Sequence, residues 1–227
     1  MELIKRRFLV LLLVASCLTI QTSSSADSLA CDKGNDISAD DCHFFFLRKP
    51  FGQEHTDQRI LQRLQDAGAD VSLSRSYAVV ISISEYPKFE SEKDGRLPEA
   101  KTDLETLKRF LVDQSFDEII VVENKDATRQ NIDRILGTYL NKQLDLRPKA
   151  ARVLIAYTGH GAPGDPENKI PGSLVLYEAR DSADSDHLYD LQDLRPKLEK
   201  LANKSFQFVT LIGSCYSGGL LDRKSVV

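Results

Sequence analysis

Two side chains that can act together as a nucleophile and a base each follow an apolar stretch of the chain. His160 comes directly after the run 151–157, within Thr-Gly-His-Gly, and Cys215 comes after the run 206–212, within Gly-Ser-Cys. Ligands of open α/β sheets bind outside the carboxyl ends of the strands, so a histidine after one strand and a cysteine after the next can meet there. The sequence therefore predicts a Cys/His site.

The chemistry open to this pair is nucleophilic catalysis. A thiol titrates near ~8.5 and an imidazole near ~6.5, so a neighbouring histidine can take the thiol proton or stabilise the thiolate. Cys215 would then attack a carbonyl carbon to form an acyl-enzyme. His160 would protonate the leaving group as it departs. The alternative for Cys215 is a buried, inert thiol, which is the common state of free cysteines. The matching histidine loop favours the reactive state.

The elements that must position this pair alternate along the second part of the chain. The expected strands are 77–83, 118–122, 152–157 and 206–212, the expected helices are 98–112, 128–140 and 188–202, and 173–177 is expected to form a hairpin strand. Such alternation is typical of an α/β fold whose open, mostly parallel sheet is covered by helices on both faces. One catalytic domain over 76–227 is the expectation.

The segment before this domain, 27–75, is polar and irregular. It contains an apolar cluster at 44–46 and a stretch, 58–67, whose apolar positions recur at helical spacing. We expect this N-terminal segment to pack on the outside of the core.

The first 26 residues have the pattern of an export signal. Three basic residues at 5–7 precede a 13-residue apolar run at 8–20, which is shorter than the roughly 20 residues that a membrane-spanning helix needs. Small residues follow, so we expect 1–26 to be removed and the product to be secreted or periplasmic. The alternative is a lipoprotein processed at Cys17, which would anchor the protein to a membrane.

Composition excludes one class of partner and agrees with export. The chain has 227 residues, of which 41% are hydrophobic, and a formal net charge of −4. Without a basic patch beyond 5–7, it lacks the positive surface of a nucleic-acid-binding protein. Cys31 and Cys42 lie in the polar segment, where they could close a disulfide loop in an oxidising compartment.

Four segments together carry a family resemblance. In order they are 77–86, 97–103, 157–161 and 214–219. Their order and sequence resemble the caspase and metacaspase-like cysteine peptidases, especially the bacterial type, over roughly 75–222. His160 precedes Cys215 by 55 positions (160 to 215), close to the interval of about 50 that is typical of caspases.

The resemblance implies a caspase-like fold and hydrolysis of peptide bonds in protein or peptide substrates. It assigns the oxyanion-binding N–H groups to Gly161 and Cys215, and it implies substrate contacts by Arg96, Gly213 and Ser217. Gly213 departs from the family, because metacaspases carry an acidic residue there and caspases a glutamine. A preference for basic P1 side chains is therefore in doubt, and Arg96 has the alternative of being an ordinary exposed loop residue.

A second departure concerns the region after the nucleophile. The family fold continues into a helix and further strands, whereas this chain has twelve residues after Cys215 (215 to 227). We expect a sheet that lacks the last family strands, with self-association or a partner chain completing it. The alternatives are a non-catalytic caspase-like interaction module and an inactive fragment. A flavodoxin-like ligand-binding domain is a third alternative, but 82–86 offers no phosphate-binding glycine loop.

No cofactor is predicted, although metacaspase relatives often bind calcium through acidic loops. Asp181, Asp184, Asp186 and Asp190 form an acidic run here, but it lacks the glycine and terminal glutamate of an EF-hand loop. We therefore interpret this run as a solvated acidic face, with calcium activation as the alternative.

Overall fold

We analysed a computed structural model, which describes residues 39–50, 58–90, 95–165, 167 and 171–215. The predicted signal segment, Cys17, Cys31 and Ser217 lie outside the described residues. Within them, no helix is both long enough and apolar enough to span a membrane.

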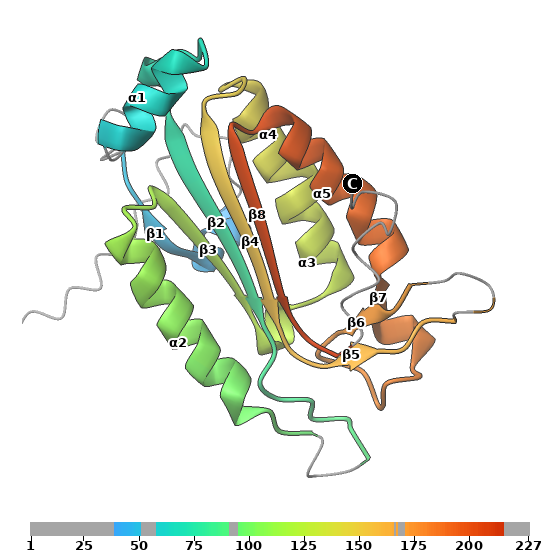
Figure 1. Cartoon of the computed structure of the whole chain (residues 1–227). Coiled ribbons are helices and arrows are strands. Elements are labelled where there is room, and N and C mark those ends of the chain that lie inside the picture. Colours follow the sequence, from blue (N-terminus) through green and yellow to red (C-terminus); the bar gives the residue numbers. More distant parts are fainter. Residues whose placement is uncertain (1–38, 51–57, 91–94, 166, 168–170, 216–227) are drawn as a thin grey trace, which may run out of the picture. The chain divides into compact units, whose positions relative to one another are not determined.

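A five-stranded sheet forms the centre of the fold, in the order β1-β3-β2-β4-β8 (Figure 1). Its strands are β1 (Phe45–Arg48), β2 (Arg75–Ser82), β3 (Glu118–Glu123), β4 (Ala151–Thr158) and β8 (Gln207–Gly213). β2, β3, β4 and β8 run parallel, and β1 pairs antiparallel with β3. The predicted mostly parallel sheet is confirmed.

Helices cover both faces of this sheet (Figure 1). One face carries α2 (Pro98–Asp113), which packs on β2 and β4. The other carries α3 (Arg129–Asp133), the π-helical segment η4 (Arg134–Leu140), α4 (Asn141–Asp145) and α5 (Leu191–Lys204). Parallel strands joined through helices bury both faces of the sheet, which explains the nearly continuous apolar runs of the sequence.

The core on the α2 side is formed by small and branched side chains of the strands and by the buried face of the helix. It consists of Ala78, Val80, Leu104, Leu111, Phe116, Ile119, Leu154 and Ala156. All eight residues of β2 are buried, as expected for a strand at the centre of a covered sheet.

Buried charges join the amino ends of β2 and β3. The Arg75 guanidinium donates to the Glu118 carboxylate at 2.8 Å, and both side chains are fully buried. The Tyr139 hydroxyl, from η4, also donates to Glu118, at 2.5 Å. Buried charges are tolerated only when they are paired and hydrogen-bonded, and this pair meets both conditions.

Three local expectations differ from the structure. Phe45 belongs to β1, so part of the N-terminal segment enters the sheet instead of packing outside it. Leu188–Asp190 is strand β7, and the helix that was expected there begins at Leu191. The helix expected at 128–140 continues through η4 and α4 to Asp145. β1 and β7 are strands because each pairs with another strand of the chain, β1 with β3 and β7 with β6 (Ser173–Val175).

Shorter elements complete the fold. α1 (Gln58–Asp66) buries Leu64 and is followed by the 3-10 turn η2 (Val71–Leu73). Two more 3-10 turns, η1 (Ala39–Phe44) and η3 (Asn124–Asp126), precede β1 and follow β3. A second sheet contains β5 (Gly161–Ala162), β6 (Ser173–Val175) and β7, with the turn η5 (Ser185–His187) before β7.

Candidate active site

The register of the sheet brings the ends of β4 and β8 level with each other. Thr158 pairs with Gly213, the last residue of β8, so the loops that carry His160 and Cys215 leave the sheet side by side. The Gly159 N–H also donates to the Gly213 carbonyl, at 3.4 Å. The sequence-predicted pair is therefore placed on adjoining loops at one edge of the sheet.

The two loops come into direct contact at Gly161. A Cβ atom built on Gly161 would lie 2.0 Å from the Cys215 carbonyl oxygen and 3.2 Å from its backbone nitrogen. Only glycine fits such a close approach of two backbones. The N–H groups of Gly161 and Cys215, the predicted oxyanion donors, thus belong to backbone segments in contact.

Two buried tyrosines hold the His160 backbone. Its N–H donates to the Tyr86 hydroxyl at 2.7 Å, and the Tyr157 hydroxyl donates to its carbonyl at 2.8 Å. The same carbonyl accepts the Val175 N–H at 3.0 Å, which ties the histidine loop to β6. The backbone that carries His160 is therefore fixed by groups from β2, β4 and β6 or from the loops next to them.

The imidazole itself packs against aromatic rings. The Phe89 ring stacks on it with a centroid separation of 5.5 Å and an angle of 13° between the planes, and the Tyr86 ring lies 4.8 Å away. Next to Phe89, Lys88 forms an exposed ion pair with Glu178 at 2.9 Å. This stack restricts the orientation of the half-buried imidazole.

Burial keeps the supporting tyrosines neutral. Burial raises the pKa of Tyr86 to about 12, and it raises the pKa of Tyr157 well above the usual value of a phenol. Loss of water disfavours the charged phenolate. Both hydroxyls therefore keep their protons over the pH range in which a thiol and an imidazole exchange theirs.

Cys215 differs from ordinary structural cysteines because it is exposed and not in a disulfide. Cys42, by contrast, is disulfide-bonded, and its expected pairing with Cys31 falls outside the described residues. The exposure of Cys215 contradicts the alternative of a buried thiol.

Arg96 and Gly213, the described residues with a predicted substrate role, lie at this same edge. Arg96 is exposed and forms an isolated antiparallel bridge with Glu85, and the neighbouring Gly95 carbonyl accepts the Tyr86 N–H at 2.8 Å. Gly213, also exposed, ends β8 two residues before the thiol. Arg96 is thus on a segment next to Tyr86, and Gly213 is the last residue of the strand that leads to Cys215.

The acidic run near β7 is not simply a solvated face. Asp181 and Asp186 are exposed, but the Asp184 carboxylate is buried and accepts hydrogen bonds from the Arg180 side chain at 3.0 Å and 3.3 Å. The Arg180 guanidinium holds the pKa of Asp184 well below its usual range. The interpretation as a solvated face is wrong for Asp184, which organises its own loop. Within the described ranges, no cluster of three acidic, histidine or cysteine side chains could hold a metal ion.

Sequence reasoning missed the side chains that support His160. Tyr86, Phe89 and Tyr157 were not assigned to the site, although each lies at or just beyond the carboxyl end of an expected strand. An aromatic residue near the carboxyl end of an expected strand was the pattern from which these supporting side chains could have been predicted.

Comparisons with known proteins show the family to which the chain belongs. The caspase domain family matches residues 75–226, a range that contains both His160 and Cys215. None of the curated proteins matches the chain. A crystal structure of the protein GSU0716 from Geobacter sulfurreducens is similar with a TM-score of 0.44 and 17% identity, over 62% of this chain and 50% of that one. The part of the chain that matches spans about half the length of that solved structure. Because the family match covers more than half of the 227 residues, the chain belongs to the caspase domain family of peptidases.

Proposed function

We propose that this protein is a cysteine endopeptidase with Cys215 as nucleophile and His160 as general acid and base. The observation that carries the proposal is the contact between the two loops, in which Gly161 meets the Cys215 backbone and leaves no space for a side chain. Family membership supports peptide-bond hydrolysis as the reaction.

The reaction would proceed in two balanced steps. The Cys215 sulfur attacks the scissile carbonyl carbon, the C–N bond breaks, and His160 gives its proton to the departing amine. Water then attacks the thioester while His160 takes a proton from it, which releases the acid product and the thiolate. The N–H groups of Gly161 and Cys215 would stabilise the oxyanion in both steps, a contribution that is commonly worth a factor of about 10²–10³ per donor.

Covalent labelling tests the proposal most directly. Peptide acyloxymethyl ketones with Arg, Lys, Asp or apolar P1 groups are added with and without calcium, and mass spectrometry identifies the modified residue. We expect labelling at Cys215, because only an activated thiolate displaces this leaving group efficiently. The preferred P1 group then gives the specificity that Gly213 leaves open, and the calcium arm tests activation by that ion.

Two variants are the controls for this experiment. Cys215→Ala removes the nucleophile and is expected to abolish labelling and turnover. His160→Ala keeps the thiol and is expected to slow labelling by at least about 10²-fold. Equal labelling of wild type and His160→Ala would show a merely accessible thiol and would sink the proposal.

A non-catalytic interaction module is the second candidate. Gly213 supports this candidate, because a glycine two positions before Cys215 has no charged side chain that could bind a P1 side chain. In that case neither Cys215→Ala nor His160→Ala would change the protein's biological activity, and no substrate would be cleaved. In this second candidate function, a second copy or a partner chain would pair with β8 and complete the sheet.

We also propose that the protein is exported. The disulfide at Cys42 supports this, since disulfides persist in oxidising compartments, and so does the signal-like pattern of residues 1–26. Fractionation of cells that express the full chain, with N-terminal sequencing of the product, distinguishes cleavage after residue 26 from lipidation at Cys17 and from retention.

A further inference from the structure

Three rings meet around the candidate general base. The Phe89 ring lies nearly parallel to the His160 imidazole, at an angle of 13° and a centroid separation of 5.5 Å. The Tyr86 ring is tilted against both, with its centroid 4.8 Å from the imidazole and 5.0 Å from Phe89. These separations lie in the range in which aromatic rings attract one another. Each ring of this cluster therefore packs against the other two.

A tight turn brings Phe89 back toward Tyr86. The Phe89 N–H donates to the Tyr86 carbonyl at 3.1 Å, which closes a four-residue turn with Pro87 as its second residue. Proline is favoured at that position of a turn because its ring fixes φ at about −65°. The sequence Tyr-Pro-Lys-Phe thus brings the backbones of the two aromatic residues together.

Hydrogen bonds fix this turn relative to the histidine loop. Tyr86 is buried, its N–H donates to the Gly95 carbonyl at 2.8 Å, and its hydroxyl accepts the His160 N–H at 2.7 Å. On the other side of Phe89, the Glu90 N–H donates to the Arg180 carbonyl at 3.3 Å. The residues on both sides of the Phe89 ring are therefore tied to other parts of the chain.

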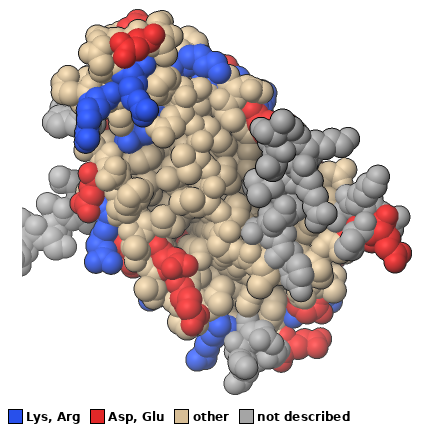
Figure 2. Space-filling model, viewed as in Figure 1, with Lys and Arg blue, Asp and Glu red and all other residues tan. Residues whose placement is uncertain are grey.

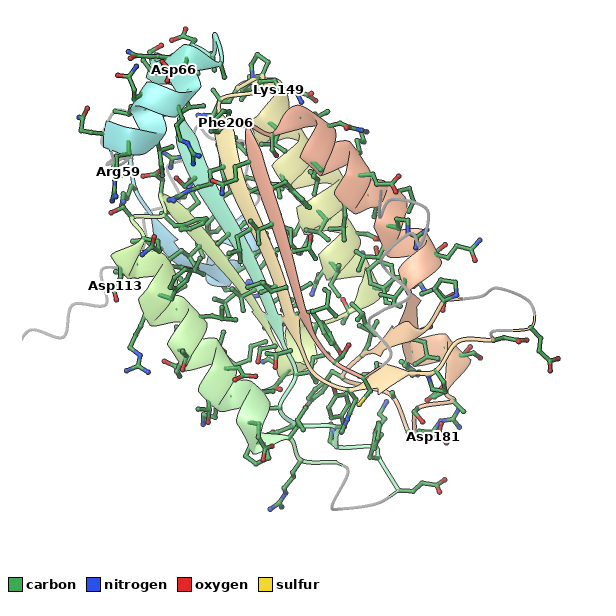
Figure 3. All side chains as sticks on the ribbon, viewed as in Figure 1. Arg59, Asp66, Asp113, Lys149, Asp181 and Phe206 are labelled. Carbon is green, nitrogen blue, oxygen red and sulfur yellow. The ribbon has the colours of Figure 1, made fainter. Side chains whose placement is uncertain are left out.

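The segment 176–187, which supplies the Arg180 carbonyl, joins β6 to β7. Asp181, labelled in Figure 3, marks this segment at the end of the sheet where β5, β6 and β7 lie. Figure 2 shows acidic side chains on the surface there, and Asp181 is exposed. At the start of the same segment, the Val175 N–H donates to the His160 carbonyl at 3.0 Å. The hairpin of β6 and β7 thus contacts both the His160 backbone and the chain next to Phe89.

We propose that Phe89 is a positioning residue for His160, whose ring fixes the plane of the imidazole for proton transfer. The inference rests on the proposed function, in which His160 gives a proton to the departing amine. Proton transfer requires donor and acceptor atoms within about 2.6–3.2 Å of each other, and a displacement of about 1 Å can cost about 10²-fold in rate. Tyr86 and Tyr157 hold the His160 backbone, and the stack with Phe89 acts on the imidazole itself.

Nuclear Overhauser contacts test the position of the imidazole independently of peptidase activity. The sequence has four histidines, and the ring signals of His160 are assigned by their loss in His160→Ala. In the wild type we expect a cross-peak between the rings of Tyr86 and His160, whose centroids are 4.8 Å apart. Phe89→Leu keeps an apolar side chain but removes the ring, so this cross-peak should weaken. Phe89→Tyr keeps the ring and should keep the cross-peak at its wild-type intensity.

Phe110→Leu is the matched control, because Phe110 is exposed on α2 and outside the ring cluster. Its cross-peak between Tyr86 and His160 should equal that of the wild type. An unchanged cross-peak in Phe89→Leu would overturn the proposal. An equal loss in Phe110→Leu and Phe89→Leu would show a general loosening of the fold and would overturn it as well.

The kinetics of Cys215 labelling test the consequence for the reaction. Rates at increasing concentrations of the preferred peptide ketone give the limiting rate and the half-saturating concentration separately. We expect Phe89→Leu to lower the limiting rate about tenfold, less than His160→Ala does, without changing the half-saturating concentration. Phe89→Tyr should restore the limiting rate.

Two kinetic outcomes would count against the positioning role. An unchanged limiting rate in Phe89→Leu would overturn it, and a change confined to the half-saturating concentration would make Phe89 a substrate contact instead. If the wild type is not labelled at all, the proposed function fails. The cross-peak between Tyr86 and His160 then decides by itself whether Phe89 positions the imidazole.

Discussion

At the scale of single residues, a substitution that disturbs the close approach of Gly161 to the Cys215 backbone is expected to slow the reaction of Cys215. Gly161→Ala would place a methyl carbon 2.0 Å from the Cys215 carbonyl oxygen, far inside van der Waals contact. The cysteine loop must move by about an ångström, and such displacements at a reactive centre commonly cost about 10²-fold. We expect the rate of Cys215 labelling by a peptide ketone to fall by that order, as followed by mass spectrometry over time.

Gly213→Ala is the matched control for this variant. It adds the same methyl group at the last residue of the neighbouring strand β8, but its nearest contact would be the Tyr157 carbonyl oxygen at 3.5 Å, an ordinary van der Waals distance. Its labelling rate should stay within a few-fold of wild type. If both variants label alike, the contact at Gly161 has no catalytic importance.

The sequence predicted the candidate site residues but not the side chains that support them, for a physical reason. The reactivity of cysteine and histidine and the conformational freedom of glycine follow from the residue type alone. His160, Cys215 and Gly161 could therefore be chosen by type and by their position after expected strands. The role of Tyr86 depends on a contact with residue 160, 74 positions away. Such a contact follows from sheet register and from loop packing, neither of which a local pattern contains.

At the scale of elements, the buried ion pair between β2 and β3 is expected to dominate the stability of their pairing. Glu118→Gln would leave the fully buried Arg75 without its carboxylate partner. Removing one member of a buried pair typically costs about 3–5 kcal/mol. Urea unfolding at pH 7 should show a loss of that size.

Glu105→Gln is the control for this loss. It removes the partner of Lys108 in an exposed pair on α2, at a helical spacing where such pairs contribute about 0.3–0.5 kcal/mol. A Glu118→Gln effect no larger than that of Glu105→Gln would mean that water or another group satisfies Arg75.

Element boundaries in the parallel sheet were well predicted, since fully buried strands are continuous apolar runs. Expected strand 152–157 lies within β4, and expected helix 98–112 lies within α2. Among the short elements, the hairpin strand expected at 173–177 contains β6 (Ser173–Val175), but β1 and β7 were not predicted. β1 and β7 each depend on a partner strand elsewhere in the chain, β3 for the first and β6 for the second. A run of three or four residues is too short for its period to reveal such pairing.

At the scale of the whole molecule, several buried tyrosines make stability depend on alkaline pH. Burial raises the pKa of Tyr77, Tyr86, Tyr139, Tyr157 and Tyr189, to about 12 for Tyr86. Between pH 10 and pH 12 the unfolded chain releases phenolic protons that the folded chain retains, so the free energy of unfolding falls as pH rises. Below pH 10 both states are protonated, and this contribution is complete.

Urea midpoints measured from pH 8 to pH 11.5 check this expectation. The wild-type midpoint should be insensitive to tyrosine ionisation near pH 8 and should fall steeply above pH 10. Tyr86→Phe removes one of the shifted groups, so its midpoint should fall less steeply over the same interval. Parallel curves for the two proteins would contradict a raised pKa at Tyr86.

The parallel sheet also determines when the loops of His160 and Cys215 come together during folding. Arg75 pairs with Ala151, 76 positions away, and Arg152 pairs with Gln207, 55 positions away. The chain loses entropy when loops of this length close, before the stabilising contacts between the strands have formed. Sheets of this kind therefore form slowly. The His160 and Cys215 loops can meet only after β4 and β8 have paired. During refolding, far-ultraviolet circular dichroism should therefore recover before reactivity toward a peptide ketone, and the thiol reports completion of the last long-range pairing.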